Sequence, residues 1–435
     1  MYDDFYRVHY TIRKFCLQER KKASDEKAFE KKDFHKICFF LRLDGSIIKY
    51  HDKNILCRRN EEMVYTEQNL VRIAKRENNP KRTYLVVNRF QGKHIPAKPH
   101  DALAMFCALA DTLRTSFEEE RLLVIGFAET ATAIGAAVAA ELGADYIQTT
   151  RELVPDAKYL YFSEEHSHAT EQKLVKNDMD TALGNIDRIL FVEDEVTTGR
   201  TILNIIEILK KQYPKHLKYC VASILNGMDK TALDTYKDCG IELFWLVKTE
   251  HVAYTQIAAS YKGNGVYVDC RDNAAAIHAT EQVKPKMIYA KKQMNARRIV
   301  SAALYQQYCE SLYQNLTSQI DLKHAQKILV LGTEEFMYPA LYTASKLEMQ
   351  GKNVWFHATT RSPIAVSEER DYPFHTRYEL ISFYDDKRKT YVYDLQTYDM
   401  VVVMTDAQGE KTAGICSLMQ ALRSCGNEHI IFVFS

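Results

Sequence analysis

The sequence predicts an α/β protein in which two tandem parallel-sheet domains, the second degenerate, follow an N-terminal hood segment that contains β-strands. Strand-like apolar runs alternate with helix-like stretches, the alternation stops near residue 280 and restarts at residue 327, and the second series repeats motifs of the first. A chain of 435 residues is also too long for one ordinary core. We expect a hood or accessory segment at 1–82, a first domain at 83–280, a helical connector at 281–326 and a second domain at 327–435.

The composition excludes several classes of function. Lysine and arginine number 58 against 57 aspartates and glutamates, so no net field attracts nucleic acid or a membrane surface. The first ten residues lack the apolar stretch of a secretory signal, and no apolar run reaches the roughly 18 residues of a membrane helix. The ten cysteines show no CxxC pair, which favours reduced thiols. We therefore expect a cytoplasmic protein that binds neither nucleic acid nor membrane.

The first domain shows strand and helix patterns in alternation. Before it, residues 36–51 are typical of two strands around the turn Asp44-Gly45. Apolar side chains recur at helical spacing in 101–117, and 130–142 is a helix of small residues that can lie close to a sheet. Residues 153–176 have no clean period and predict a long loop with room for a short hairpin. Apolar, β-branched runs predict strands at 83–88, 121–126, 145–151, 188–194, 219–226 and 242–247, with an amphipathic helix at 201–212.

The second domain restarts the alternation, and its motifs indicate an internal duplication. Strands are expected at 327–332, 353–361, 400–406 and 429–435, with a helix after the first, a loop after the second and a helix after the third. In both series the first strand ends in glycine with a glutamate three residues later, the second ends in Thr-Thr-Arg, and the third ends in aspartate. The matched pairs are Gly126 and Gly332, Glu129 and Glu335, 149–151 and 359–361, and Asp194 and Asp406. The alternative is that α/β units resemble one another by composition alone.

The stretch ILFVEDEVTTGRT at residues 189–201 joins a buried strand, an acidic pair and a turn rich in threonine and glycine. A helix N-terminus presents unpaired N–H groups and partial positive charge, so the turn from Thr197 to Thr201 suits a phosphate. The carboxylates of Glu193 and Asp194 suit instead the hydroxyls of a sugar or a hydrated Mg²⁺. A ribose 5-phosphate meets both demands. The alternative is an ordinary capped helix after a buried strand.

The acid pair followed by TTGRT resembles the loop with which type I phosphoribosyltransferases hold 5-phosphoribosyl-1-diphosphate (PRPP). More narrowly, GKHIPAKP, FAETATAIG, TTRE and EEHSHA resemble the orotate-phosphoribosyltransferase-like enzyme of bacterial tellurium-resistance and stress-response operons. The C-terminal TTRSPI resembles the TRSP domain fused to that enzyme. The resemblance covers about residues 60–435, and it implies two type I phosphoribosyltransferase-like domains that use PRPP, a small-molecule acceptor and Mg²⁺.

The resemblance also implies catalytic residues. Transfer from PRPP passes through an oxocarbenium-like state as diphosphate leaves, so catalysis rests on positioning and charge stabilisation. The candidates are two strand-end carboxylates that hold the ribose hydroxyls and Mg²⁺, a cation near the leaving group, and two histidines of a mobile loop: Glu193, Asp194, Arg151, His166 and His168. For the arginine and the histidines, the alternative is an ordinary exposed side chain.

The substrate-binding candidates fall into four groups. The loop after the first strand would hold diphosphate, the threonine-glycine turn the 5-phosphate, the loop before the first helix the acceptor, and the TRSP motif another anion or the acceptor. In chain order they are Lys93, His94, Ala128, Glu129, Thr130, Ala131, Thr197, Thr198, Gly199, Arg200, Thr201, Thr360, Arg361 and Ser362. Lys93 and His94 can equally be loop charges, and the TRSP segment can be a purely structural partner.

Three departures from the family pattern qualify the assignment. Thr197 stands where purine-salvage relatives often carry an aspartate that serves the purine ring, which weakens a purine-salvage role. Glu195 adds a third carboxylate that either increases dependence on Mg²⁺ or faces water. The second domain has MTDAQGEKTAG in place of the acid pair and turn, so it is not expected to bind PRPP in the usual way.

The sequence thus predicts Mg²⁺-dependent transfer of the 5-phosphoribosyl group of PRPP to an unidentified, nitrogenous acceptor, in the synthesis of a nucleotide-like metabolite. One alternative is a PRPP- or nucleotide-binding regulator without turnover. A PRPP-synthesising diphosphokinase is less favoured, because the sequence supplies no convincing ATP site. The expected protein partners are a second copy in a homodimer and enzymes of the same operon.

Overall fold

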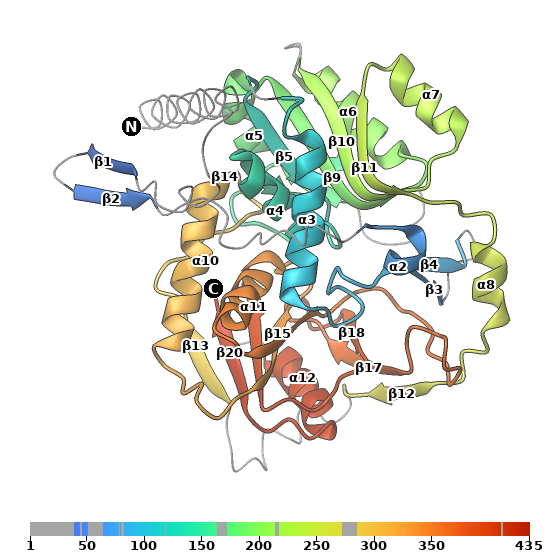
Figure 1. Cartoon of the computed structure of the whole chain (residues 1–435), viewed down its shortest axis with the longest axis vertical. Coiled ribbons are helices and arrows are strands. Elements are labelled where there is room, and N and C mark those ends of the chain that lie inside the picture. Colours follow the sequence, from blue (N-terminus) through green and yellow to red (C-terminus); the bar gives the residue numbers. More distant parts are fainter. Residues whose placement is uncertain are drawn as a thin grey trace, which may run out of the picture. The chain divides into compact units, whose positions relative to one another are not determined.

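The computed structural model describes residues 39–43, 46–50, 64–77, 79, 82–117, 119–162, 172–213, 217–271, 285–409 and 412–435 (Figure 1). The first two ranges are β1 (Phe39–Leu43) and β2 (Ser46–Tyr50), an antiparallel hairpin that confirms the two strands expected around Asp44-Gly45. The hairpin belongs to a compact body of residues 1–55, and the remaining elements belong to a larger body, 56–435. All further description concerns this larger body, which contains two sheet units: the first sheet with its helices is the first unit, and the second sheet with its helices is the second unit.

The first sheet has the strand order β11-β10-β9-β5-β6-β14. Its strands β5, β6, β9, β10 and β11 are parallel, as continuous apolar runs joined by helices predict. The strands are β5 (Leu122–Gly126), β6 (Asp145–Gln148), β9 (Arg188–Val196), β10 (Lys218–Asn226) and β11 (Glu242–Lys248). The helices are α3 (Pro99–Leu113), α4 (Thr132–Leu142), α6 (Arg200–Gln212) and α7 (Lys230–Asp238).

The second sheet has the order β13-β20-β19-β15-β16, with all neighbours parallel. Its strands are β13 (Lys286–Tyr289), β15 (Lys327–Gly332), β16 (Asn353–Ala358), β19 (Met400–Thr405) and β20 (Ile430–Phe434). Its helices are α10 (Ala302–Thr317), α11 (Tyr338–Met349) and α12 (Thr412–Ser424). The predicted α/β fold with two parallel-sheet units is therefore confirmed.

Each sheet unit carries an antiparallel hairpin after its second strand. In the first unit β7 (Tyr159–Phe162) pairs with β8 (Gln172–Val175), which confirms a hairpin within 153–176. In the second unit β17 (Thr376–Ile381) pairs with β18 (Lys389–Tyr393), and β12 (Val266–Asp269) adds to β17. The region of β17 and β18 was expected to be a loop. The hairpins extend the correspondence between the two units.

A further hairpin and several short helices complete the described part. The hairpin is β3 (Val71–Lys75) with β4 (Tyr84–Asn88), and it packs against the second unit through a small core that includes Ile364 and Tyr393. The short helices are α2 (Glu67–Leu70), α5 (Lys176–Ala182) and α8 (Tyr254–Ser260). The β3-β4 hairpin, which spans the predicted boundary between the hood and the first domain, therefore contacts the second sheet unit.

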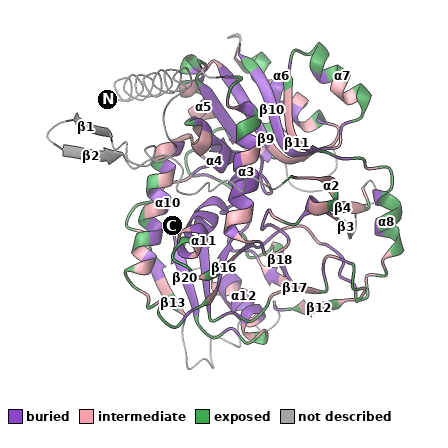
Figure 2. Cartoon of the chain, viewed as in Figure 1, coloured by how far each residue is buried: buried purple, intermediate pink, exposed green. Residues whose placement is uncertain are grey.

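The helices α3, α4, α10 and α11 lie between the two sheets (Figure 1). Helix α11 packs on both α3 and α4, and α10 packs on α4 and α11. One continuous hydrophobic core runs from Leu123 of β5 to Val330 of β15 and includes Leu341 of α11. Figure 2 shows α3, α4, α11 and the central strands as mainly buried, whereas α10 also presents intermediate and exposed residues. The two sheet units therefore share a core.

The two sheets also exchange edge segments. Ala97, which precedes α3, pairs with Phe356 of β16, with N···O distances of 2.9 and 2.8 Å. In the same way β14 (Val300–Ser301), which precedes α10, pairs with β6 through Tyr146. Residues 281–326 thus hold the expected helix α10 and also two strands, β13 and β14, that each join a different sheet. The sequence analysis missed these strands because they are only four and two residues long.

Helix α4 lies close to the first sheet because its residues are small. A Cβ placed on Gly135 would lie 2.8 Å from the Cα of Gly126 in β5, so only glycine fits at this crossing. The adjacent Tyr146 of β6 donates a hydrogen bond of 2.7 Å to the carbonyl of Thr132. The small-residue helix expected here is confirmed, and its first turn follows directly on the loop after β5.

Two global expectations can be compared with the described residues. Cys220, Cys239, Cys270, Cys309, Cys416 and Cys425 are free thiols. Cys107 is disulfide-bonded, so the expectation of reduced cysteines is wrong at that position. Among the described residues, no helix combines the length and apolar character needed to cross a membrane.

Candidate active site

The acidic residues Glu193, Asp194 and Glu195 lie at the carboxyl end of β9, which runs two residues further than predicted. The carboxylate of Asp194 accepts a hydrogen bond of 2.9 Å from the hydroxyl of Thr130, in the loop after β5. Burial raises the pKa of Asp194, and the neighbouring charge of Glu195 adds to this shift. The structure therefore brings the acid pair and the predicted diphosphate loop together at one sheet edge.

The threonine-glycine turn is held by Gly199, the N-cap of α6. Gly199 has φ +70°, in the left-handed region. A Cβ there would lie 2.4 Å from the phenol oxygen of Tyr236, which donates a hydrogen bond of 2.7 Å to the carbonyl of Gly199. Glycine is thus required both by backbone conformation and by space. The turn is fixed between the end of β9 and α7, with the N-terminus of α6 directly behind it.

The loop after β5 supplies backbone amides. The amide of Ala128 donates to the hydroxyl of Thr149 at 2.8 Å, and that of Ala131 donates to the carbonyl of Phe127 at 2.9 Å. The amides of Glu129 and Thr130 have no hydrogen-bond partner within the described residues. The Ala128–Glu129 peptide is cis. Two of the four predicted amides are therefore engaged within the fold, and a role of the other two in diphosphate binding stays a prediction.

Glu195, at the carboxyl end of β9, forms an ion pair with Arg82 at the end of the predicted hood segment. Both of its carboxylate oxygens accept from Nη2 of Arg82 at 2.7 Å, and His251 Nε2 lies 3.4 Å away. The other ring nitrogen of His251 lies 2.9 Å from the hydroxyl of Tyr84 in β4. The alternative in which Glu195 faces water is wrong, because its side chain is only 10% exposed and is ion-paired.

A second group of charges lies where the loops after β5 and β6 meet the loops after β15 and β16. We call it the ionic cluster, and its members are Lys93, Glu129, Glu152, Arg297, Glu334, Glu335, Arg361 and Arg388. The two Thr-Thr-Arg triplets lie here, because Thr150 donates to Glu335 at 2.7 Å and Arg361 contacts Glu129 at 3.3 Å. Of these residues the sequence analysis singled out Lys93, Glu129, Glu335 and Arg361.

The predicted acceptor residues Lys93 and His94 are buried. The ammonium of Lys93 is ion-paired with Glu129 and donates to the carbonyls of Glu334 and Thr359 at 2.9 Å. His94 has a buried Nε2 without a hydrogen-bond partner in the described structure. Both side chains are 3% exposed or less, so they serve as interior groups in the present arrangement. A role in acceptor binding stays a prediction.

The other predicted residues are placed as follows. Thr360 is buried and forms a bridge with Tyr391 of β18, and Ser362 donates its amide to the Thr360 hydroxyl at 3.3 Å. The amide of Arg151 donates to Glu335 at 2.9 Å. His166 and His168 lie outside the described residues. The site roles of these residues, and of the turn 197–201, stay predictions.

Two buried histidines should make the fold sensitive to acid. Burial lowers the pKa of His94 to about 3 and that of His357 in β16 to about 4, from 6.5. Below pH 6.5 these histidines become protonated in the unfolded chain but stay neutral in the folded chain. The free energy of unfolding therefore falls as the pH drops from 6.5 towards 4, by about 1.4 kcal/mol per pH unit for each histidine. We expect His357→Gln to reduce the slope of unfolding free energy against pH by the contribution of one histidine. Urea unfolding at several pH values measures this slope. Substitution of the exposed His324 by glutamine is the control. An unchanged slope in His357→Gln would contradict the prediction.

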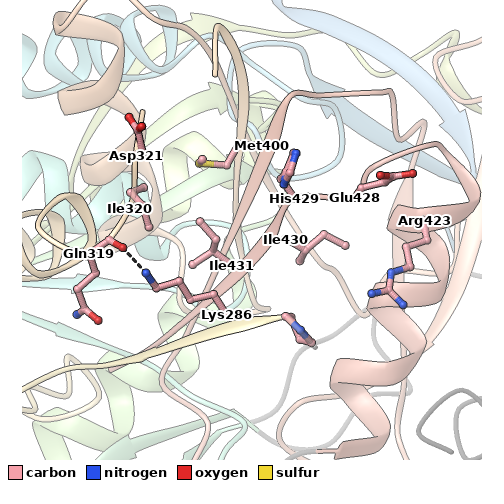
Figure 3. A pocket seen from close by; sticks show the side chains of 11 residues that line it. Lys286, Gln319, Ile320, Asp321, Met400, Arg423, Glu428, His429, Ile430 and Ile431 are labelled. Atoms are coloured by element: carbon pink, nitrogen blue, oxygen red, sulfur yellow. Dashed lines mark hydrogen bonds between the residues drawn. The ribbon is translucent and has the colours of Figure 1, made fainter. Parts of the chain in front are cut away.

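Two surface pockets lie away from the acid pair. Figure 3 shows one of about 300 Å³ at the amino ends of β13, β19 and β20, where Lys286, Met400 and Ile430 begin these strands. Lys286 donates to the carbonyl of Gln319 beside it. Ligands of parallel sheets bind at carboxyl ends, so this pocket is not the counterpart of the candidate site. The other, of about 640 Å³, is lined partly by Lys98 and Trp355.

The metal question depends on the donor set. Within the described residues no group of three or more histidine, cysteine, aspartate or glutamate side chains is arranged to hold a metal ion. The adjacent carboxylates of Glu193 and Asp194 are hard oxygen donors of the kind that Mg²⁺ prefers, and Mg²⁺ usually completes its shell with substrate phosphates and water. The raised pKa of Asp194 is the shift that a nearby cation would oppose. The residues present therefore fit Mg²⁺ shared with a substrate.

Comparisons with known proteins bear on both units. Residues 70–256 match the sequence model described as "Phosphoribosyl transferase", and residues 298–422 match the one described as "TRSP domain C terminus to PRTase_2". No curated protein matches the sequence. The chain is similar to a solved adenine phosphoribosyltransferase from Rhodothermus marinus, with 14% identity and a TM-score of 0.29 over 42% of this chain and 96% of that one. It is also similar to the adenine phosphoribosyltransferase from Trypanosoma brucei in complex with AMP, pyrophosphate and ribose-5-phosphate, with 14% identity and a TM-score of 0.30 over 41% of this chain and 76% of that one. It is also similar to orotate phosphoribosyltransferase from Aeropyrum pernix (15%, 0.24, 36% and 76%).

The family matches agree with the geometry of the site. The first match contains the acid pair, the threonine-glycine turn and the loop after β5, and the second contains the TRSP motif itself. The chain therefore carries a phosphoribosyl transferase domain followed by a TRSP domain, and it is an enzyme of the phosphoribosyltransferase class.

Proposed function

We propose that this chain transfers the 5-phosphoribosyl group of PRPP to a nitrogenous small-molecule acceptor, with Mg²⁺, in the synthesis of a nucleotide-like metabolite. The observation that carries the proposal is the hydrogen bond between Asp194 and Thr130, because it joins the acid pair to the loop after β5 in front of the Gly199 turn. One ligand with a diol between two phosphate groups matches that order of acceptors and donors. PRPP has this chemistry.

The carboxylates of Glu193 and Asp194 accept hydrogen bonds from the ribose hydroxyls. The turn from Thr197 to Thr201 binds the 5-phosphate at the N-terminus of α6, and the amides of Glu129 and Thr130 bind diphosphate. Mg²⁺ bound beside the acid pair would supply positive charge to the departing diphosphate. The protein's own contribution is to fix the ribose against the acceptor and to stabilise developing charge.

The finer expectations belong to the same proposal. Arg151, His166 and His168 act on the leaving diphosphate, and Lys93, His94, Thr360, Arg361 and Ser362 serve the acceptor side. We place the enzyme in the cytoplasm, in a tellurium-resistance or stress-response operon, as a homodimer that works with other enzymes of that operon. The support for these points is the sequence resemblance.

The test is turnover with a mixed pool of acceptors. Purified wild-type protein is incubated with PRPP, MgCl₂ and the small-molecule fraction of a bacterial extract, and diphosphate release and new phosphoribosylated masses are followed by mass spectrometry. Diphosphate release that requires the extract supports transfer. Tight PRPP binding without turnover would instead indicate a regulator, and formation of AMP and PRPP from ATP and ribose 5-phosphate would indicate a diphosphokinase.

A further inference from the structure

The ionic cluster contains reciprocal contacts between corresponding residues of the two units. Glu335 of the second unit accepts from the hydroxyl of Thr150 at 2.7 Å and from the amide of Arg151 at 2.9 Å. Its counterpart in the first unit, Glu129, lies 3.4 Å from the amide of Arg361 and 3.3 Å from its Nε. Each first-loop glutamate is therefore held by the Thr-Thr-Arg segment of the other unit.

Two cations, each just before a helix at the corresponding place in its unit, add further contacts between the two units. Lys93, before α3, is ion-paired with Glu129 and donates to the carbonyl of Thr359 in the second unit. Arg297, before α10, is ion-paired with Glu335 at 2.9 Å and contacts the Thr150 hydroxyl of the first unit at 3.1 Å. Each glutamate thus pairs with the cation that precedes a helix of its own unit and contacts the Thr-Thr-Arg segment of the other unit.

Arg361 is the central cation of this arrangement. Its guanidinium lies within 3.4 Å of carboxylate oxygens of Glu129, Glu152, Glu334 and Glu335. Although burial alone would lower it, these carboxylates raise the pKa of Arg361, and in turn Arg297 and Arg361 lower the pKa of Glu335 to about 2. The Glu129 carboxylate is buried between the ammonium of Lys93 and the guanidinium of Arg361. Because burying a charge that has lost a partner is costly, removing Arg361 would weaken the hold on Glu129 and leave Lys93 as its ion-pair partner.

We propose that Arg361 of the TRSP domain is a positioning residue for the loop after β5. The loop's only glutamate, Glu129, is anchored to the second unit, and its neighbouring amides are those assigned to diphosphate. The TRSP domain would then complete the site without contacting the reacting atoms. This inference rests on the proposed function for its ligand, but not for its claim about the loop.

The first readout is amide hydrogen exchange of the ligand-free full chain. Arg361→Ala should speed exchange at the amides of Ala128 and Ala131, which are hydrogen-bonded in the wild type, by at least about tenfold. Arg361→Lys keeps the charge but loses the planar fork, and it should restore part of the protection. The control is Arg377→Ala, because Arg377 is also 11% exposed and ion-paired, with Glu77 at 2.7 Å, but lies outside the cluster. Unchanged protection of Ala128 and Ala131 in Arg361→Ala would overturn the proposal.

The reciprocal variant separates positioning from general loosening. Glu335→Gln should speed exchange at the amide of Arg151, which Glu335 binds, and leave Ala128 protected. If Arg361→Ala fails to fold, Glu335→Gln and Arg361→Lys carry the test. Equal loss of protection at both loops in either variant would show a loss of packing alone and would refute the positioning role.

The second readout is PRPP affinity, measured by calorimetry with MgCl₂. A misplaced diphosphate loop should weaken binding by about tenfold or more in Arg361→Ala, with partial recovery in Arg361→Lys and none of the loss in Arg377→Ala. Unchanged affinity in Arg361→Ala would overturn the positioning role. Wild-type protein that does not bind PRPP would refute the proposed function, and hydrogen exchange alone would then decide the role of Arg361.

Discussion

Replacing Glu193 and Asp194 together with alanine is expected to abolish measurable PRPP binding. The two carboxylates are the proposed acceptors for the ribose hydroxyls, and each hydrogen bond to a charged group is worth about 1.5–3 kcal/mol, so the affinity should fall by at least about a hundredfold. Calorimetry in MgCl₂ measures the change. Asp234→Ala serves as the control, because Asp234 is an exposed acid of α7. An affinity that remains within a factor of about three would remove the acid pair from the site.

The same double variant should remain folded. Burial raises the pKa of Asp194, so the folded state bears a desolvation cost for this carboxylate that alanine does not have. We therefore expect the melting temperature to stay at the wild-type value or to rise. A large drop in melting temperature would mean that lost binding reflects unfolding. Asp194→Asn alone, which keeps the hydrogen bond from Thr130 available, would then serve as the milder variant.

Gly199→Ala should be the most disruptive single substitution in the phosphate turn. A left-handed backbone costs a residue with a side chain about 1–2 kcal/mol, and overlap with a packed neighbour costs about 1–3 kcal/mol more, so the free energy of unfolding should fall by about 2–5 kcal/mol. The overlap is with the phenol of Tyr236, 2.4 Å from the added methyl group. Because that phenol also holds the Gly199 carbonyl, PRPP affinity should fall as well. Urea unfolding and calorimetry measure the two effects.

Gly240→Ala is the matched control for this substitution. Gly240 has a similar φ of +68°, but a Cβ there meets nothing within 4 Å. It should therefore show only the backbone cost of about 1–2 kcal/mol and leave PRPP binding intact. If both glycine variants lose the same stability, the contact with Tyr236 does not constrain the turn.

The sheets could be predicted because buried parallel strands appear in the sequence as continuous apolar runs. The run before Glu193 and the run 400–404 both became central strands, and the motif after the first identified the loop that precedes α6. The hairpin of β17 and β18 was missed because its strands are short and lie in a stretch rich in charged residues, with no long apolar run to mark them. The strands β13 and β14 were missed because they are stabilised by the sheets they join rather than by local propensity.

The charged contacts of the site could be predicted only in part. The duplication marked Glu129 and Glu335 as equivalent residues, and the Thr-Thr-Arg triplets marked Arg361. Their mutual contacts join positions more than 180 residues apart, and no local pattern encodes such docking. The pairing of Glu195 with Arg82 was missed for the same reason. Residue type thus indicated which groups matter, whereas the partner of each group depends on how the two sheet units pack.

The mutual exchange of edge segments has an evolutionary consequence. In an assembly of identical subunits, every substitution appears in all copies, so neither half can abandon the chemistry without the other. A single polypeptide that contains both halves is free of that coupling. Selection can then act on each half separately: MTDAQGEKTAG stands in the second half at the position of the acid pair and turn, while Glu335 and Arg361 contact the first half.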